Sequence, residues 1–332
     1  MKKFLNNPAD IMEEMLEGMA LANQKILYWE KGTHRIMRRS KKETGKVKII
    51  IGNGGGHEPG SIGWIGYGMY DMASMGDVFA AQSGKQLYES IRTINDGSPI
   101  FLTIANHAGD VMNGNMAVRY AKRDGIEIES SIFYDDIVSA PKETPEERRG
   151  LTGMFFGVKM AGAVAEEGGS LQECVRAFEK ARTFTRSLSL VTSGCTHPQT
   201  GMVMSELPDD IVNIGAGVHG EGGSENVKFT TSKDLAKRAI DMLLADMPVS
   251  EGEEVIILVN GMGSTTMMEL AIFYQDTYKY LKQMGINVYD GIADSLFTTQ
   301  ETGGITLSIC KIDPEMKQWW DAPCQTISYI KS

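Results

Sequence analysis

The sequence has little cysteine, a deficit of basic charge and no long apolar run. Its 332 residues contain four cysteines, and 33 basic side chains stand against 43 acidic ones. A general nucleic-acid binder needs a basic face that displaces counterions, and docking on anionic lipid needs one too. The net charge of -10 therefore argues against both classes. We expect no direct contact with nucleic acid and no membrane partner.

The cysteines are far apart and form no C-x-x-C pair, which argues against a zinc ribbon and a disulfide framework. We interpret them as small buried hydrophobes in a reducing compartment. They are Cys174, Cys195, Cys310 and Cys324. No stretch approaches about 18 uncharged apolar residues, and the first seven residues lack the apolar run of a signal peptide. These absences predict a cytoplasmic protein.

Glycine is in excess, at 37 residues, which is about 11% of the chain against a usual value of about 7%. The glycines cluster, so the excess belongs to loops. At roughly 100–200 residues per domain, the length suggests two domains. We place the boundary near residue 185, with an N-terminal α/β domain over 1–185 and a C-terminal α/β domain over 186–332.

Short apolar runs alternate with helical patterns along the chain. This rhythm is typical of an α/β fold, and we expect two α/β domains with mixed sheets flanked by helices. The predicted strands cover 47–51, 100–104, 126–133, 254–259, 286–289 and 305–312. The predicted helices cover 8–22, 115–122, 151–167, 170–183 (capped by Ser170) and 265–283. Ligands in such folds bind at the carboxyl ends of strands, which is where we expect the site.

Three of the five histidines follow predicted strands or lie in glycine-rich segments. The first, His57, lies in the segment 52–60 after Gly54, Gly55 and Gly56. Glycines allow backbone N–H groups to approach a ligand and form an anion nest. The segment lacks both the Gly-x-Gly-x-x-Gly spacing and the Gly-Lys-Ser/Thr of a nucleotide loop. It is either a ligand loop of another kind or a structural turn.

The second segment contains His107 and Asp110. Asp110 is a candidate general base for a reacting hydroxyl, and the alternative is an aspartate that caps the following helix. Nothing else in the sequence supports His107. In the third segment, 215–223, glycines surround His219. A neutral imidazole there can be a nucleophile or a metal ligand. Because neither His-x-His nor His-x-x-x-His spacing is present, the metal alternative is weaker and no metal site is expected.

These motifs occur in one order with several others, and together they resemble the K subunit of bacterial dihydroxyacetone kinase, the ketone-binding half of a split kinase. The resemblance runs from about residue 47 to 325. The motifs that carry it are Gly54-Gly55-Gly56-His57-Glu58-Pro59, Gly109-Asp110, Tyr134-Asp135-Asp136, Arg148-Arg149-Gly150, Gly217-Val218-His219-Gly220-Glu221, Val259-Asn260 with Gly263, Glu301-Thr302-Gly303 and Trp320-Asp321-Ala322-Pro323.

The resemblance implies a mechanism for these residues. The histidine matching His219 attacks the ketone of dihydroxyacetone through Nε2 and holds it as a covalent hemiaminal, which glycerol cannot form. The histidine matching His57 assists as an acid and base. The aspartate matching Asp110 takes the proton from the hydroxyl to be phosphorylated. The glycine loop, Gly54 above all, presents backbone groups to the substrate.

The resemblance also implies partners. No cofactor resides on the K subunit, which forms a homodimer. The phosphoryl group comes from a separate L subunit that holds ADP and magnesium. A phosphotransferase M component, supplied by phosphoenolpyruvate, recharges it. We expect no room in 332 residues for the helical nucleotide domain of the single-chain, ATP-dependent relatives.

Four positions depart from the family pattern. Ala105 stands where the family has a lysine, and Ala81 stands where it has a serine. Gly222 replaces a proline, and Asn53 lies in a loop that usually reads Gly-Gly-Gly-Ser-Gly-His. Each lost polar contact costs roughly 1–3 kcal/mol if its buried partner stays unpaired. Two interpretations follow: a kinase subunit, with dihydroxyacetone or another short ketose as substrate, or a non-catalytic paralogue that binds the ketose and acts as a coactivator of a transcriptional regulator.

Overall fold

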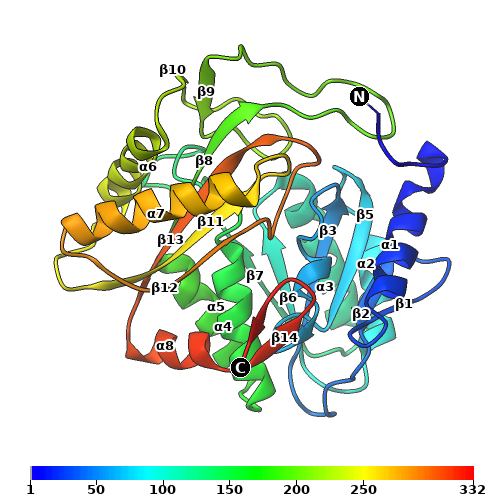
Figure 1. Cartoon of the computed structure of the whole chain (residues 1–332). Coiled ribbons are helices and arrows are strands. Elements are labelled where there is room, and N and C mark those ends of the chain that lie inside the picture. Colours follow the sequence, from blue (N-terminus) through cyan, green and yellow to red (C-terminus); the bar gives the residue numbers. More distant parts are fainter. Residues whose placement is uncertain (1) are drawn as a thin grey trace.

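Buried β-branched runs form the centre of a six-stranded sheet in the computed structural model, which describes residues 2–332. In spatial order its strands are β1 (Leu27–Trp29), β2 (Arg35–Arg38), β5 (Met72–Val78), β3 (Lys48–Gly55), β6 (Ile100–Ala105) and β7 (Ile128–Phe133). The strands from β5 to β7 are parallel, and on the other side β2 pairs antiparallel with both β5 and the edge strand β1. This sheet occupies the right-hand half of Figure 1.

The second half of the chain builds another six-stranded sheet. Its order is β10 (Glu225–Lys228), β9 (Ile211–Ile214), β8 (Thr185–Ser193), β13 (Gly303–Ile312), β11 (Glu254–Gly261) and β12 (Asn287–Asp294). Only β11 and β12 pair in parallel. A small third sheet joins β15 (Ile330–Lys331), β14 (Cys324–Thr326) and β4 (Gly66–Tyr67). The mixed α/β fold predicted from the sequence is confirmed.

Alternation along β3 assigns its side chains to two cores. Ile50 packs in one cluster with α2 (Gly84–Ile94) and α3 (Ala108–Arg123). Ile49 and Ile51 point to the opposite face, toward α4 (Met154–Glu166) and α5 (Leu171–Thr183). The first sheet is therefore covered by helices on both faces, as a largely parallel sheet must be.

Helix α4 lies between the two sheets. Every residue from Met154 to Ala165 is buried, and the same hydrophobic cluster includes Ile256 and Leu258 of β11. A helix buried on all sides fits only such an enclosed position, and its one charged side chain, Lys159, donates to the carbonyl oxygen of Trp319 at 2.8 Å. Helices α6 (Ser232–Asp246) and α7 (Met267–Gln283) cover the outer face of the second sheet (Figure 1). The two remaining α-helices of residues 2–332 are α1 (Ile11–Ala22) and α8 (Pro314–Asp321). Within residues 2–332, no helix is long and apolar enough to cross a membrane.

Local signals explain where these helices begin. Ser170 caps α5, as the sequence predicts, and forms a reciprocal capping box with Glu173. Helix α3 differs from its prediction, because it begins at Ala108 and not near residue 115. Gly109 and Asp110 in its first turn have low helix propensity, so the sequence pattern did not indicate a helix there. The helix nevertheless starts three residues after the end of β6 at Ala105. The domain boundary near residue 185 stays a prediction; β8 begins at Thr185.

Asp135 connects the two halves of the chain. It follows β7, is fully buried and accepts hydrogen bonds from the backbone N–H groups of Leu151 (2.6 Å) and Gly153 (3.0 Å). The hydroxyl of Ser187 on β8 donates a third bond. Burial raises the pKa of Asp135 to about 6. One carboxylate thus fixes the strand end, the entry to α4 and the second sheet.

Replacing Asp135 with alanine is expected to lower the free energy of unfolding by about 2–3 kcal/mol, because it strands two buried N–H donors. Urea denaturation followed by circular dichroism measures this change. Asp209→Ala is the matched control, since Asp209 is exposed and should change stability by less than about 0.5 kcal/mol. Equal effects of the two substitutions would contradict the connecting role of Asp135.

Candidate functional site

The site lies where strand ends from both sheets meet. His57 follows β3 and His107 follows β6, at the carboxyl ends of two parallel strands. His219 belongs to the glycine-rich loop after β9, and the loop after β12 contributes Phe297 and Thr298. The structure thus brings the predicted His57 and His219 together with His107, from segments far apart in the sequence, at the strand ends where a ligand site was expected.

His57 is held rigidly. Its Nδ1 lies 2.8 Å from the carbonyl oxygen of Thr298, and its ring stacks on Phe297 with centroids 4.7 Å apart and planes inclined by 10°. Only 2% of the residue is exposed. Burial, with a smaller contribution from the charge of His219, lowers the pKa of His57 to about 3. His57 is therefore neutral, and it carries its proton at Nδ1, because a carbonyl oxygen can only accept.

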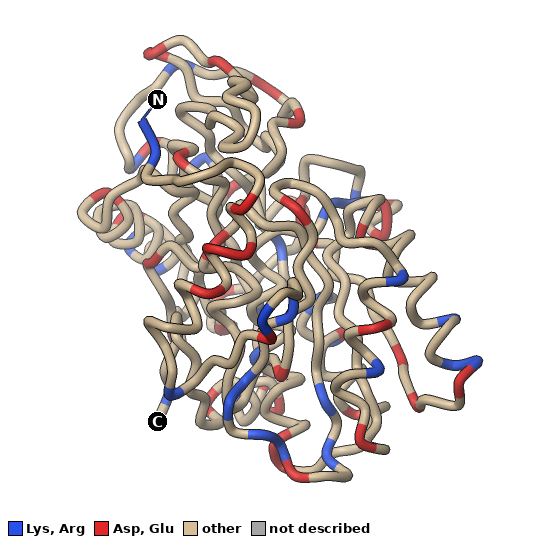
Figure 2. The backbone as a smooth tube through the Cα atoms, turned by 90° about the vertical axis from the view of Figure 1, so that its right-hand side faces the viewer, with Lys and Arg blue, Asp and Glu red and all other residues tan. Residues whose placement is uncertain are grey.

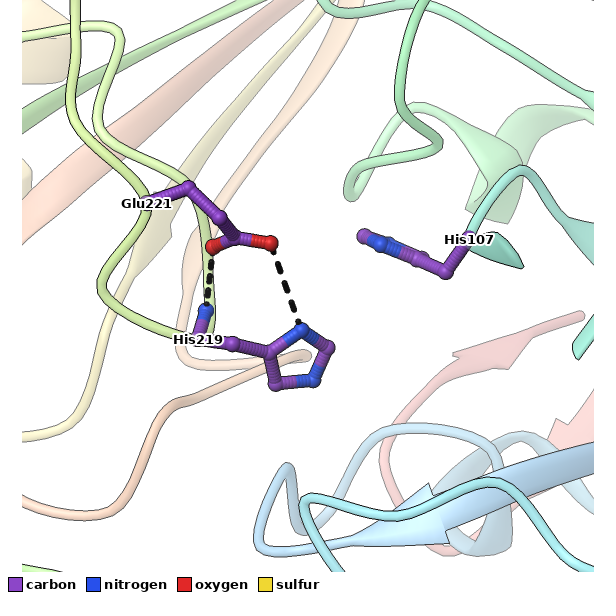
Figure 3. A group of neighbouring side chains, drawn as sticks. All are labelled: His107, His219 and Glu221. Carbon is purple, nitrogen blue, oxygen red and sulfur yellow. Dashed lines mark hydrogen bonds and ion pairs between the residues drawn. The ribbon is translucent and has the colours of Figure 1, made fainter. Parts of the chain in front are cut away.

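His219 faces His57 through one ring nitrogen and Glu221 through the other. The Nε2 atoms of His57 and His219 are 3.1 Å apart. On the other side of the ring, His219 Nδ1 lies 3.5 Å from Glu221 Oε1, as Figure 3 shows. The backbone N–H of His219 donates to Glu221 Oε2 at 2.8 Å. Burial alone would raise the pKa of Glu221, but the interactions with His219 outweigh it and hold that pKa well below its usual range. A carboxylate therefore supports the nitrogen opposite the one that meets His57.

Arg149 anchors the loop that carries His219. Its guanidinium donates to the carbonyl oxygen of Gly215 at 2.8 Å and pairs with buried Asp136 at 2.7 Å. Gly217 is needed beneath it, because a Cβ there would lie 2.3 Å from the Arg149 guanidinium and 2.2 Å from the Glu221 carboxylate. The small residues of this loop therefore make room for the charged groups that position the imidazole.

His107 also belongs to the site, although the sequence offered it no support. Its Nε2 lies 3.0 Å from the carbonyl oxygen of Gly150, and its ring centroid is 5.2 Å from that of His219. Burial lowers the pKa of His107 to about 4. A neutral ring that donates from Nε2 leaves the lone pair of Nδ1 free.

Asp110 lies in the first turn of α3, and His107 occupies the N-cap position of that helix. The alternative in which Asp110 is the cap therefore does not hold. Burial raises the pKa of Asp110 to about 7, and the nearby charge of His219 opposes that rise. A carboxylate with a pKa close to neutrality is suited to proton transfer.

The glycine loop is closely packed. A Cβ on Gly54 would lie 3.0 Å from the backbone of Ala80, and Gly56 has a φ of +95° that favours glycine. The N–H of Gly54 donates to Asn53 Oδ1 at 2.9 Å, and that of Gly56 donates to Glu58 Oε1 at 3.0 Å. Neither N–H group is free to bind a ligand. The anion nest predicted for this loop would form only if a ligand replaced Asn53 and Glu58 as the hydrogen-bond acceptors.

Several site residues escaped the sequence analysis. Phe79 and Phe297 flank His57, and they lie outside the quoted motifs. Arg149 lies inside one motif, but no spacing rule connects it to a loop more than sixty residues away. Two of the four departures also lie here: a Cβ on Gly109 would lie 3.1 Å from Ala81 Cβ, and a Cβ on Gly150 would lie 3.1 Å from Ala105 Cα.

Charged residues of both signs are spread along the chain. Figure 2 shows red Asp and Glu segments and blue Lys and Arg segments interspersed along a backbone that is mostly tan.

The comparisons with known proteins agree on one family. The profile of the Dak1 domain matches residues 17–328. A Listeria innocua protein described as "PTS-dependent dihydroxyacetone kinase 1, dihydroxyacetone-binding subunit DhaK" is 36% identical over 99% of this chain and 100% of its own length. A D-erythrulose kinase of Mycolicibacterium smegmatis is 33% identical over the whole of this chain, which spans 57% of that longer protein.

A solved structure supports the same grouping. The protein described as "Dihydroxyacetone kinase operon co-activator Dha-DhaQ" superposes with a TM-score of 0.90 at 30% identity. The match covers 96% of this chain and 98% of that protein. Relatives of this chain thus include both a subunit of a kinase and a coactivator.

Proposed function

Because this chain belongs to the Dak1 domain family, we propose that it captures dihydroxyacetone, or a related short ketose, as a hemiaminal on His219 and presents a hydroxyl for phosphorylation. One observation carries the proposal: His219 Nε2 lies 3.1 Å from the buried neutral His57, while Glu221 supports Nδ1 of the same ring. This is the arrangement of a nucleophile with an acid–base partner and an orienting carboxylate.

The proton positions follow from the hydrogen bonds. His57 holds its proton at Nδ1 for Thr298, so its Nε2 accepts and His219 donates from Nε2 in the free protein. A ketose that enters between the two rings replaces this contact. The His219 proton then resides on Nδ1, facing Glu221, and the Nε2 lone pair is free to attack.

The capture step balances without another reactant. Nε2 of His219 forms a bond to the carbonyl carbon, and the π electrons of the C=O bond move to oxygen. The oxygen takes a proton from solvent through Nε2 of His57, while Nδ1 of His219 gives its proton to Glu221, which returns it to solvent. The net change is the transfer of one proton from the His219 ring to the oxygen. A neutral ring and a neutral ketone thus give a neutral hemiaminal. The low pKa of His57 suits the relay, because its protonated form gives the proton up readily.

Asp110 is placed to take the proton from the hydroxyl that is phosphorylated. We propose that the phosphoryl group comes from a separate L subunit bearing ADP and magnesium, recharged by a phosphotransferase M component, with this chain a cytoplasmic homodimer. The relative named as a dihydroxyacetone-binding subunit matches this chain over its full length, which supports a division of labour between chains.

Two positions favour a second candidate function. Ala105 and Ala81 leave the neighbourhood of Asp110 without the lysine and serine typical of the family, and the coactivator is structurally similar to this chain. In this alternative the ketose still binds at His219, but no phosphoryl transfer follows. The bound ketose instead controls association with a transcriptional regulator.

A reconstituted assay separates the two functions. The protein is mixed with an L subunit, an M component and phosphoenolpyruvate, and the ketose phosphate is measured over time with dihydroxyacetone and with erythrulose. We expect turnover that requires all components. No turnover, together with ketose-dependent saturable binding to a regulator, rejects the kinase subunit and supports the coactivator.

A further inference from the structure

Three side chains that can bind a metal converge in the site. His107, His219 and Glu221 each offer a ligand atom, and these atoms all lie within 4.8 Å of one another. In Figure 3 the His107 ring points from one side toward the pair formed by His219 and Glu221. The three come from the N-cap of α3 and from the loop after β9, so sequence spacing alone could not indicate the group.

The hydrogen bonds leave the right lone pairs for a cation. His107 donates from Nε2 to Gly150, which leaves Nδ1 as its lone pair. His219 donates from Nε2 to His57, so a neutral ring has its Nδ1 lone pair only 3.5 Å from Glu221 Oε1. A lone pair and a carboxylate oxygen that face each other repel, so a positive group belongs between them. A proton on Nδ1 fills this place when His219 hydrogen-bonds to Glu221, and a metal cation can fill it when the ring holds its proton on Nε2.

We propose that this group binds a divalent transition metal of the zinc class. Two imidazoles and one carboxylate are a common zinc ligand set that leaves a fourth position open. Ligands at about 2.0–2.1 Å in a tetrahedral site are about 3.4 Å apart, so His107 has to approach the other two by roughly an ångström.

The surroundings fit a metal site. Each histidine donates its other N–H to a fixed acceptor, which is the usual second shell of a metal-bound imidazole. Glu221 Oε2 is held by the N–H of His219, which leaves Oε1 for the ion. The cation beside Glu221, Arg149, is 4.0 Å from Oε2 and is paired with Asp136 at 2.7 Å. Its charge is therefore largely compensated.

Metal binding should slow ketose capture, a consequence that rests on the proposed function. A metal on Nδ1 keeps the single ring proton of His219 on Nε2. Capture starts from the opposite state, with the proton on Nδ1 and the lone pair on Nε2. The ion therefore acts as an inhibitor that holds the unreactive tautomer.

Cobalt(II) tests the site directly, because four- or five-coordinate cobalt absorbs visible light far more strongly than the hydrated ion. Titration of the metal-free full chain should reach one equivalent per chain. His107→Ala and His219→Ala should lose the bands. Glu221→Gln should weaken binding at least ~10-fold, because the loss of a partner that only supports a metal ligand already costs about 10–100-fold. His34→Ala, in the turn between β1 and β2, is the matched control and should bind normally. Absent bands, or bands unaffected by His107→Ala, would overturn the site.

The rate of ketose capture tests the inhibition separately. Saturating zinc should slow adduct formation. Adduct formation at an unchanged rate with zinc bound overturns the inhibition. If cobalt binding depends on the three residues but the metal-free protein forms no adduct, the proposed function fails while the metal site stands.

Discussion

His219→Ala is expected to abolish covalent retention of dihydroxyacetone. The native protein should gain one ketose mass per chain in native mass spectrometry, and the variant should gain none. The reason is that Nε2 of His219 is the nucleophile that faces the neutral acid–base partner His57 at 3.1 Å. His57 is unsuited to replace it, because its Nδ1 is bonded to Thr298 and its ring is fixed by stacking on Phe297.

A control keeps this prediction specific. His197 also lies near the site, with its ring 5.5 Å from that of Phe79, yet it faces neither Glu221 nor His57 in the contacts of residues 2–332. His197→Ala should retain the adduct. Thermal unfolding of both variants checks that each is folded. An adduct that persists in folded His219→Ala, or that is lost equally in both variants, would contradict the assignment of His219 as the nucleophile.

The strands and helices that position the site were largely predictable, because they depend on local patterns. The buried run before His57 and the apolar segment after residue 150 predict β3 and α4, and both form. The environment of α4 was not predictable. The helix is buried on all sides because a second sheet packs on it. A local sequence pattern can indicate a buried helix but cannot predict which sheet covers it.

In the site, too, local patterns indicated some residues, but the contacts between distant segments could not be predicted. Strand ends and glycine clusters pointed to His57 and His219, but their ring-to-ring contact spans 162 positions in the sequence. Asp110 was ambiguous because a helix cap and a general base can have the same local sequence. The start of α3 at Ala108 excludes Asp110 from the N-cap position, and its role as a base stays a prediction. His107 had no motif of its own, and its place became clear from its contacts with Gly150 and His219.

Asp110→Asn is expected to reduce phosphoryl transfer by about 10²–10⁴-fold while leaving the adduct on His219 intact. The amide cannot take the hydroxyl proton, but capture of the ketone depends on other groups. In the native protein, burial raises the pKa of Asp110 from 3.8 to about 7. Because the ionised form is the base, turnover in the reconstituted assay should rise with pH through about 7 and then level off. The variant should lack this rise.

Stability provides a second, independent readout of the same carboxylate. Its folded-state pKa exceeds its unfolded value, so the folded state prefers the protonated form, and ionisation destabilises the protein as pH rises from about 4 to about 7. The amide of the Asp110→Asn variant carries no such charge. The Tm of the variant should therefore exceed that of the native protein by a margin that widens over this range and is constant above it. This behaviour is expected of a functional site in which a reactive buried carboxylate lowers the stability of the folded protein. A margin that is the same at about pH 4 and about pH 8, on either side of the titration, would show that Asp110 is not the buried base, whatever its effect on turnover.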